Sequence, residues 1–518
     1  MIAEQYPVVI VGGGPVGMGL AVDLGRRGVE CLVVERHQTP QRIPKGQNLT
    51  QRTMEHFAFW GVEDEVRATR HMPEDYPNSG VTAYGNLMSD YSYPWWKRSM
   101  VGDYYSRPNE RIPQYETERV LRETVAALDP VTVLYDWSGE AVDGSAVRIV
   151  SKETGDETLV EAEFVVGCDG SHSTIREAAG IGEIMSHHGR RMVLLVFRSP
   201  ELHEALGRFG EAAFFNIMDP TLDGYWRFLG RVDGEGEFFF HAPVPPDATE
   251  ETYDFAGLLH DSVGTRFEVD FEYVGFWDLR IAVADPYRKG SVFVAGDAAH
   301  SHPPYGGYGI NTGFEDVRNL GWKLAAWFEG WGSEALLDSY GDERQPVFQS
   351  TASDFIEKMI DSQREFVTRH DPDRDRDDFE KAWEERKKRS AMGVADFEPH
   401  YEGSPIVWAD GTPSAVGSHE FIARAGHHLP PRSGVFDALG PGFTLVSVDA
   451  DVTAENAIQM AADELGVPVG VVRRARTGEA ADYGSGLILV RPDHFVAWVG
   501  DDADSALARE VLARSVGR

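Results

Sequence analysis

Three glycines near the start of the chain have the spacing that a nucleotide phosphate requires. Gly12, Gly14 and Gly17 form a G-x-G-x-x-G motif. The first glycine permits a tight turn, the second lets the backbone approach a pyrophosphate, and the third lets a helix lie close to a strand. A helix that begins there would present free N–H groups and the positive end of its dipole to the phosphates. The motif therefore predicts a phosphate-binding loop.

The residues around this motif supply the elements that such a loop needs. Residues 8–11 are a short β-branched run, apolar residues recur at helical spacing from Met18 to Gly25, and a second apolar run ends at Glu35. An acid at the tip of the second strand, about 20 residues after the last glycine, can accept hydrogen bonds from ribose hydroxyls. This order predicts a half-site for an adenine dinucleotide, either NAD or FAD.

Two later segments place acids at the ends of further apolar strands. Residues 164–168 lead into Asp169-Gly170, and residues 292–295 lead into Gly296-Asp297. An Asp-Gly pair after a strand is by itself a common turn. Asp297, however, can bond a polyol chain, and the Pro/Gly loop at 303–309 exposes backbone N–H groups before a helix whose N-terminus favours negative charge.

In this order, the three segments resemble the FAD-dependent aromatic hydroxylases, which are single-component flavoprotein monooxygenases with the fold of para-hydroxybenzoate hydroxylase. Residues 48–55 and His302-Pro303-Pro304 look most like the branch that hydroxylates phenol and chlorophenol. The resemblance implies an α/β fold in which a Rossmann-like FAD-binding domain carries an inserted mixed-sheet substrate domain. It also implies a thioredoxin-like C-terminal α/β domain.

On this template the domains follow in a discontinuous order. The FAD-binding domain would comprise residues 1–75, 105–185 and 275–400, the substrate-binding domain residues 76–104 and 186–274, and the C-terminal domain residues 405–518. The last of these contains no cysteine, which excludes dithiol–disulfide chemistry there and leaves a structural or subunit-contact role. The dense charges of residues 371–390 predict a solvated helix that leads to a linker.

The resemblance also implies which residues bind the cofactors. Gly12, Gly14, Gly17, Glu35 and Arg36 would contact the adenosine and pyrophosphate of FAD, Gln114 and Asp297 its ribityl and phosphate region, and Pro304, Gly306, Gly309, Ile310 and Asn311 its isoalloxazine, the last two through backbone N–H groups. Asp169 would serve both FAD and the nicotinamide. The sequence contains no second G-x-G-x-x-G motif for NAD(P)H. This agrees with the resemblance, because in this family NAD(P)H binds transiently over the flavin domain. The sequence does not distinguish NADH from NADPH.

Aromatic residues are unusually frequent in both stretches assigned to the substrate domain, which suits a pocket for a planar apolar ligand. By analogy with the family, Tyr225 and Arg227 would polarise a phenol and hold a carboxylate, with His241 as a weaker candidate. Structural packing is the competing interpretation for each of them. Residues 44–48 lack the aspartate by which phenol hydroxylases help to deprotonate phenol. Either Tyr225, a histidine or the substrate's own groups would replace it, or the ring would be activated in a different way.

The function that these residues imply is oxygenation of a small aromatic substrate. We expect an FAD- and NAD(P)H-dependent monooxygenase that uses O2 to hydroxylate a phenolic or related electron-rich ring through a flavin C4a-hydroperoxide. The same flavin chemistry could end instead in oxidative decarboxylation, dehalogenation or Baeyer–Villiger insertion, and a non-catalytic flavin-binding protein is a further alternative. A halogenase is disfavoured, because its W-x-W-x-I-P segment is absent.

Composition excludes several other classes of protein. The 518 residues carry a formal net charge of −35, which repels nucleic-acid phosphates and anionic membranes. Cys31 and Cys168 are the only cysteines, so a disulfide framework, a cysteine zinc site and an iron–sulfur cluster are excluded, and we predict no metal site. We expect a cytoplasmic homodimer without nucleic-acid or membrane partners.

Overall fold

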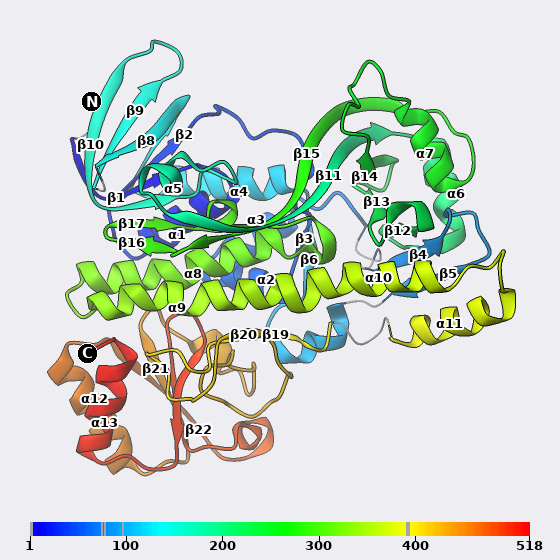
Figure 1. Ribbon diagram of the computed structural model, residues 1–518. Helices are drawn as coiled ribbons and strands as arrows, with labels where there is room; N and C mark the ends of the chain where they lie inside the picture. Colours follow the sequence, from blue (N-terminus) through cyan, green and yellow to red (C-terminus); the bar gives the residue numbers. More distant parts are fainter. Residues whose placement is uncertain (1–3, 74–75, 77–78, 96–97, 144, 390–393) are drawn as a thin grey trace.

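The computed structural model describes residues 4–73, 76, 79–95, 98–143, 145–389 and 394–518. Two sheets lie at opposite ends of the upper half of the view, long helices run beneath both of them, and an α/β unit formed by the C-terminal residues lies below the helices (Figure 1). None of the helices in these ranges is both long and apolar enough to cross a membrane.

The first sheet is built around a parallel core. Its strand order is β16-β17-β10-β1-β2-β7, and the neighbours from β17 to β7 are all parallel. The bounds are β1 (Gln5–Val11), β2 (Cys31–Glu35), β7 (Val131–Tyr135), β10 (Glu157–Gly167), β16 (Arg288–Lys289) and β17 (Val292–Val294). Because Val11 pairs with Val34 and Gly167, and Gly167 pairs with Val294, the carboxyl ends of four strands meet at one edge. The glycine loop, Glu35, Asp169 and Asp297 follow those ends.

Helices cover the first sheet where its strands are apolar. Val8, Val9 and Ile10 of β1 are completely buried, as expected for a strand with neighbours on both faces. The covering helices include α1 (Pro15–Arg26), α4 (Gln114–Ala126) and α8 (Gly309–Phe328). Strands β8 (Trp137–Asp143) and β9 (Ala146–Ser151) form an antiparallel pair, and β9 also pairs antiparallel with β10, so both strands extend this sheet.

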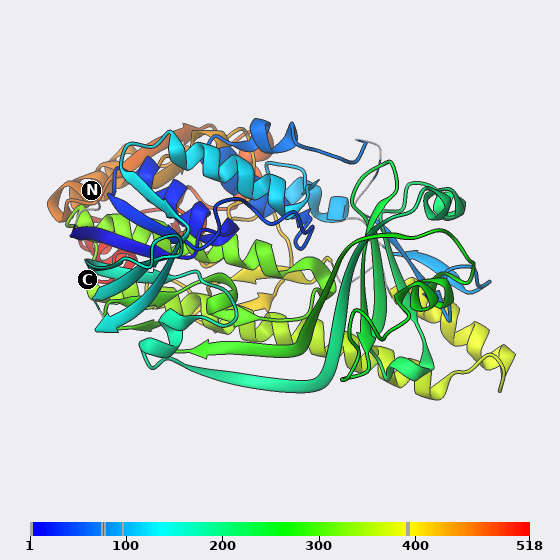
Figure 2. The same cartoon turned by 90° about the horizontal axis from the view of Figure 1, so that it is seen from above.

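The second sheet is mostly antiparallel, in the order β18-β15-β11-β14-β13-β12-β4-β5, and only β4 and β12 pair in parallel. The bounds are β4 (Gly80–Tyr84), β5 (Ser92–Trp95), β11 (Gly182–Arg198), β12 (Phe214–Met218), β13 (Trp226–Arg231), β14 (Glu237–Val244), β15 (Asp270–Asp285) and β18 (His300–Ser301). Strands β11 and β15 are long enough to run from beside the first sheet to the far end of the second (Figure 2). One face packs on α7 (Phe255–Val263), and an aromatic cluster covers part of the other.

A helical rod links the two ends of the molecule. Helix α9 (Glu334–Ser350) continues through a π-helical segment (Thr351–Glu357) into α10 (Lys358–Arg369), and α11 (Arg376–Arg389) follows. We expected a solvated helix here, and the helix is present. One of its faces is buried, however, because Phe379 and Trp383, which are 0% and 4% exposed, pack against Tyr84 and Tyr93 of the second sheet. The many charged residues of this segment led us to expect a fully solvated helix, although Phe379 and Trp383 have the i, i+4 spacing that places two apolar side chains on one helix face.

The C-terminal unit is thioredoxin-like. Its sheet has the order β22-β21-β23-β24, with β21 parallel to β22 and antiparallel to β23. Its bounds are β21 (Phe443–Val448), α12 (Val452–Leu465), β22 (Val469–Arg474), β23 (Leu487–Val490), β24 (Val496–Gly500) and α13 (Ser505–Ser515). Its core continues into Trp322 of α8 and into Trp331, which follows that helix, so the unit is docked on the rest of the chain.

The division into domains stays our proposal. Strands β11 and β15 belong to both ends of the molecule, and the rod from α9 to α10 passes under both sheets (Figure 1). Residues 358–389, which we assigned to the FAD-binding domain, contact the second sheet through the Phe379 cluster.

Candidate active site

A single cavity of about 1480 Å³ joins the two sheets. The loop of Gly12 and Gly14 lines one end, and the loop of Pro304, Gly306 and Gly309 also borders it. Pockets for one small ligand usually measure about 300–1,000 Å³. The volume is therefore sufficient for a dinucleotide and a second molecule side by side, and both glycine loops face the same space.

The glycines of the N-terminal motif differ in what surrounds them. At Gly12 φ is +104°, and a Cβ atom would lie 2.3 Å from the Cys168 carbonyl oxygen. At Gly17 it would lie 1.9 Å from the Gly12 carbonyl oxygen, so this glycine lets α1 approach the turn, although it does not itself line the cavity. Gly14, at the N-cap of α1, has no atom within 4 Å of that position and borders the cavity.

Glu35 holds this loop in place. Its Oε2 accepts a hydrogen bond from the Gly13 N–H at 2.6 Å, and its Oε1 accepts one from the His37 N–H at 2.8 Å. Glu35 and Arg36 both line the cavity, as does Gln114, whose Oε1 accepts from the Gly46 N–H at 3.2 Å. Each carboxylate oxygen of Glu35 retains a second lone pair, which suits a ribose hydroxyl.

The two predicted aspartates also border the cavity. The Asp169 carboxylate accepts from the hydroxyls of Ser173 and Thr174, at 2.5 and 3.2 Å, and so fixes the start of α5 (Thr174–Ala178). The Asp297 side chain is exposed to the cavity but lies deep in the protein. Desolvation raises its pKa, and the charges of His300 and Lys45 reduce that rise.

Two buried residues that the motifs did not reveal hold the segment of Asp297. Asp316 of α8 accepts from the Gly296 N–H at 3.0 Å and from His300 Nε2 at 2.6 Å. Arg344 of α9 donates from Nε to Asp316 at 2.8 Å. The only sequence signal was that residues 343–346 match a segment of the family, which gives no role to the arginine.

The side chain of Asn311 fastens the second glycine loop. Its Oδ1 accepts from the Thr50 N–H at 2.8 Å and from Thr53 Oγ1 at 2.7 Å, while its Nδ2 donates to the Asn48 and Gly307 carbonyls. Asn311 itself does not line the cavity, whereas Pro304, Gly306, Gly309 and Ile310 do. The predicted contact of Asn311 with the flavin through its backbone stays a prediction.

An aromatic wall forms the other end of the cavity. We define this wall by the eight residues Tyr93, Trp95, Phe214, Trp226, Phe228, Phe239, His241 and Trp277, all from the second sheet. Trp226 stacks on Tyr305 of the second glycine loop with ring centroids 3.6 Å apart. The aromatic wall and that loop are therefore in direct contact. A surface made of aromatic rings favours planar apolar ligands.

The cavity gives no support to the expectation that Tyr225 and Arg227 face the substrate, which stays a prediction. Neither residue lines the cavity, whereas Trp226 and Phe228 do. Side chains alternate between the two faces of a strand, so Arg227 of β13 points away from the aromatic wall. Tyr225 precedes the strand and lies under the guanidinium groups of Arg190 and Arg364, 5.3 and 5.9 Å from its ring centre.

His241, the third candidate, does reach the cavity. It is 6% exposed, and its Nδ1 has no hydrogen-bond partner among the described residues. Desolvation lowers its pKa to about 4, so the ring is neutral at physiological pH. An imidazole in this state can accept or donate one hydrogen bond at that nitrogen according to its tautomer.

A second neutral histidine, His302, borders the same space. Its Nδ1 lies 2.6 Å from the Pro303 carbonyl oxygen and must therefore carry the proton. Nε2 is left as a buried acceptor without a partner in the described part of the chain. Burial lowers the pKa of His302 to about 4. In the sequence, His302 stands out only as part of the His302-Pro303-Pro304 motif. A sequence does not show which ring nitrogen of a histidine has a hydrogen-bond partner, so the free Nε2 could not be predicted.

The parallel sheet carries a phosphate-binding loop and two acids at its strand ends, and these face an aromatic wall across the cavity. This arrangement is typical of enzymes that use a dinucleotide cofactor to act on aromatic substrates. Comparison with known proteins agrees. Residues 5–354 match the FAD-binding domain family, and residues 428–518 match the C-terminal domain of aromatic-ring hydroxylases.

Curated relatives match the chain over nearly its full length. It is 30% identical to a 4-methyl-5-nitrocatechol 5-monooxygenase of a Burkholderia species, covering 98% of each chain. It is also 30% identical to a tetracenomycin B2 monooxygenase-dioxygenase of Streptomyces olivaceus, covering 99% of each. Among solved structures, the flavin-dependent monooxygenase PieE in complex with FAD and substrate superimposes with a TM-score of 0.84 at 25% identity over 99% of each chain.

The chain belongs to the FAD-dependent aromatic-ring hydroxylases, and it is a flavin-dependent monooxygenase. FAD is the cofactor, and the residues present fit it: the Cβ position of Gly14 is free of protein atoms beside the cavity, and the carboxylates of Glu35 and Asp297 face the same space. The contacts of individual residues with FAD are proposed below.

Proposed function

We propose that the protein hydroxylates a planar, electron-rich aromatic ring, such as a phenol, with NAD(P)H as the reductant and O2 as the oxidant. The observation that carries this proposal is the continuous cavity from the Gly12 loop to the aromatic wall. A cofactor bound along the glycine loops would have its far end beside the wall. The flavin and the substrate ring would then share one enclosed space.

At the cofactor end, the chain offers a group for each part of FAD. When bound, FAD supplies two-electron redox chemistry and the reaction with O2. We propose that the loop of Gly12 and Gly14 and the N-terminus of α1 hold the pyrophosphate, that Glu35 accepts from the ribose, and that Asp297 bonds the ribityl chain. Arg36, Gln114 and Asp169 line the path between them.

At the substrate end, the size of the aromatic wall favours a ligand with several fused rings. A single ring is smaller than the face that eight aromatic side chains from the second sheet present. The contact between Trp226 and Tyr305 joins the aromatic wall to the second glycine loop at this end. Exclusion of water from this end would protect the oxidising chemistry that FAD supplies from side reactions.

The two neutral histidines are the groups that we propose for the substrate hydroxyl. The free Nε2 of His302 accepts from it, and Nδ1 of His241 bonds a second oxygen of the substrate. With pKa values near 4, both rings polarise a phenol by hydrogen bonding and remain uncharged. These roles replace those that we first gave to Tyr225 and Arg227.

The test is turnover by the FAD-loaded enzyme with a panel of single-ring and fused-ring phenols. We expect fused-ring phenols to stimulate NADH or NADPH consumption most strongly, with one atom of isotope-labelled O2 in the product by mass spectrometry. Label in a ring-expanded product, or release of CO2 or halide, would establish one of the other outcomes of flavin oxygenation. Nicotinamide oxidation without oxygen transfer to any aromatic compound would contradict the proposal.

A further inference from the structure

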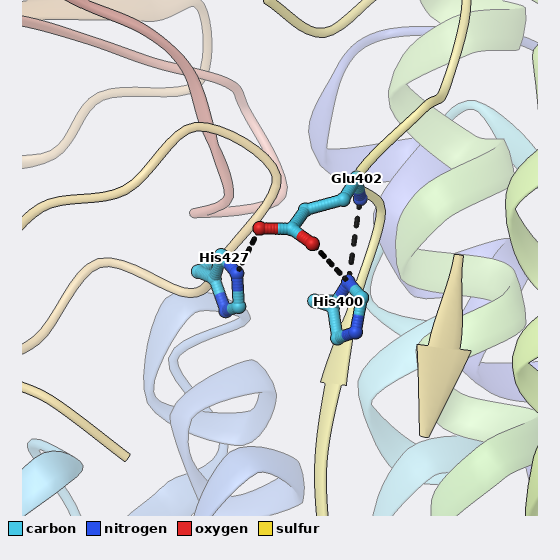
Figure 3. Close-up of side chains that lie close together, drawn as sticks. All are labelled: His400, Glu402 and His427. Carbon is cyan, nitrogen blue, oxygen red and sulfur yellow. Dashed lines mark hydrogen bonds and ion pairs between the residues drawn. The ribbon is translucent and has the colours of Figure 1, made fainter. Parts of the chain in front are cut away.

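Outside the active site, three potential metal ligands face one another at the junction with the C-terminal unit. His400 ends strand β19 (Phe397–His400), Glu402 follows two residues later, and His427 lies on the segment that precedes β21 (Figure 3). One ligand atom from each side chain lies within 4.8 Å of the other two. None of the three residues lines the cavity described above.

The hydrogen bonds of His427 leave one nitrogen free toward this centre. Its Nδ1 lies 2.9 and 3.1 Å from the two carboxylate oxygens of Glu398, so Nδ1 carries a proton and donates it. Its Nε2 then faces Glu402 Oε1 at 3.1 Å. Two lone pairs at that distance repel each other unless a proton or a cation lies between them. A carboxylate behind the outer nitrogen is the arrangement that orients metal-binding histidines.

His400 is oriented in the same way by a backbone carbonyl. Its Nε2 lies 3.2 Å from the Val416 oxygen, which makes Nε2 the donor. Nδ1 therefore has its lone pair toward Glu402, whose Oε2 is 3.8 Å away. The lone pair accepts a long hydrogen bond of 3.4 Å from the Glu402 N–H, which a bound ion would replace.

The charges around the cluster also leave room for a cation. Arg424 pairs with Glu398 at 3.2 Å and compensates the outer carboxylate. In the described part of the chain, the ion-pair partners of Glu402 are the two histidines alone. The histidine side chains are 8% and 4% exposed, whereas that of Glu402 is 38% exposed. The centre is therefore rigid on two sides and open to solvent on the third.

We propose that His400 Nδ1, His427 Nε2 and the Glu402 carboxylate bind a divalent transition-metal ion of the Zn²⁺ type, with water in the fourth position. Two imidazoles and one carboxylate suit such an ion and not Ca²⁺ or Mg²⁺, which prefer oxygen. In a tetrahedral site with bonds of about 2.0–2.1 Å, the ligand atoms lie about 3.3 Å apart. The 3.1 Å separation of His427 Nε2 and Glu402 Oε1 is close to that value.

The consequence of such a site is structural. The ion would join the end of β19 to the segment that leads into the C-terminal unit, two parts of the chain that are 25 residues apart. It would take no part in the flavin chemistry. We predicted no metal site from the sequence, on the small number of cysteines alone. A His-x-Glu triplet and one distant histidine carry no spacing that would reveal such a site.

The competing explanation is a protonated His427 between two carboxylates, without a metal. The experiment uses the FAD-loaded enzyme after treatment with a chelator and removal of the chelator. We expect calorimetric titration with ZnCl2 to show about one tight site per chain, and we expect zinc to raise the melting temperature. X-ray absorption at the zinc edge should report imidazole and carboxylate ligands.

Variants distinguish the two explanations. Glu402→Gln and His427→Asn should each weaken zinc affinity by at least roughly tenfold, and Glu398→Gln by about 10–100-fold, since it orients a ligand. Glu420→Gln, a neighbouring glutamate 3.7 Å from Arg424, is the matched control and should bind zinc like the wild type.

Flavin content verifies that each variant is folded. Equal zinc binding by the wild type and by Glu402→Gln would reveal an adventitious ion only and overturn the proposal. The same loss of melting temperature in Glu402→Gln with and without zinc would also overturn it, in favour of the ion pair.

Discussion

At the scale of single residues, the glycines of the first loop differ in what a methyl group would meet. Alanine at position 12 would place Cβ 2.3 Å from a backbone carbonyl at a φ of +104°, whereas alanine at position 14 would meet no protein atom within 4 Å. We expect Gly12→Ala to lower the melting temperature of the apoprotein and to abolish FAD loading. Backbone strain of this kind costs about 1–3 kcal/mol.

Gly14→Ala is the matched variant. Because its methyl group would point into the cofactor space, the apoprotein should melt as the wild type does, while FAD binds more weakly by roughly tenfold or more. Thermal melting of the apoproteins and fluorescence titration with FAD measure the two effects. If both variants lowered apoprotein stability equally, the proposed geometry of the loop would be wrong.

The buried histidines predict how stability depends on pH. Burial lowers the pKa values of His56, His241 and His302 from 6.5 to about 4. Between those two values the unfolded chain binds more protons than the folded one, so the free energy of unfolding falls as the pH drops from about 6.5 toward 4. For one such histidine, the fall is about 1.4 kcal/mol for each pH unit within this range.

His241→Asn removes one of these groups. Between about pH 7 and about pH 5, the variant should lose about 2 kcal/mol less stability than the wild type, because the unfolded chain no longer gains a proton at this position. Urea unfolding at the two pH values gives the comparison. An identical loss in both proteins would show that the imidazole is protonated in the folded state.

At the scale of elements, the two faces of strand β13 differ in their access to the cavity. Phe228 lines the cavity, and the adjacent Arg227 does not. We expect Phe228→Ala to raise the KM for the aromatic substrate about tenfold, equivalent to about 1.4 kcal/mol of lost contact. Arg227→Ala should leave KM within about twofold. Steady-state kinetics of the two neighbours provide the test, and the reverse ranking would restore our first assignment.

The same strand shows where prediction from the sequence reached its limit. Residues 225–229 alternate in the way that is typical of a strand, and β13 covers most of them. Which face of this strand meets the cavity depends on its pairing with β12 and β14, however, and a sequence does not show that pairing. By contrast, the loop at 12–17 and Glu35 are local features, and their shared border on the cavity followed from the motif. Asp316 and Arg344 were missed because their role exists only once α8 and α9 are packed.

At the scale of the whole molecule, a buried charge cluster docks the C-terminal unit. Glu343 of α9 pairs with Lys323 of α8 at 2.8 Å and with Arg491 after β23, and all three side chains are 0% exposed. Glu343→Gln leaves the buried Lys323 without its carboxylate partner, while Arg491 keeps Asp493 at 2.6 Å, and an uncompensated buried charge of this kind costs about 3–5 kcal/mol. We expect the variant to release the C-terminal unit to limited proteolysis.

Glu334→Gln is the control for this prediction. Its ion pair with Arg288 lies at the surface, where the glutamate is 65% exposed, and such pairs contribute about 0–1 kcal/mol. Its proteolysis pattern should match that of the wild type. Equal resistance of both variants would mean that apolar packing alone, through Trp322 and its neighbours, holds the unit in place.

The expected homodimer remains a prediction, which light scattering would test, because the structure of one chain contains no evidence on its partners.

The binding chemistry at the cofactor end could be predicted from the sequence because its residues lie close together in the chain. A phosphate loop and its acids follow one another within one βαβ unit, whereas the aromatic wall gathers residues from position 93 to position 277.

The length of β11 and β15 has a consequence for how substrate enters and product leaves. These two strands pair with each other from Gly182–Asp285 beside the first sheet to Arg198–Asp270 at the far end of the aromatic sheet, with irregularities between His187 and Arg190 and between Val196 and Phe197. Because the ribbon spans both halves, we expect them to keep their relative position while ligands pass. Loops and short helices around the ribbon would then be the parts that swing aside.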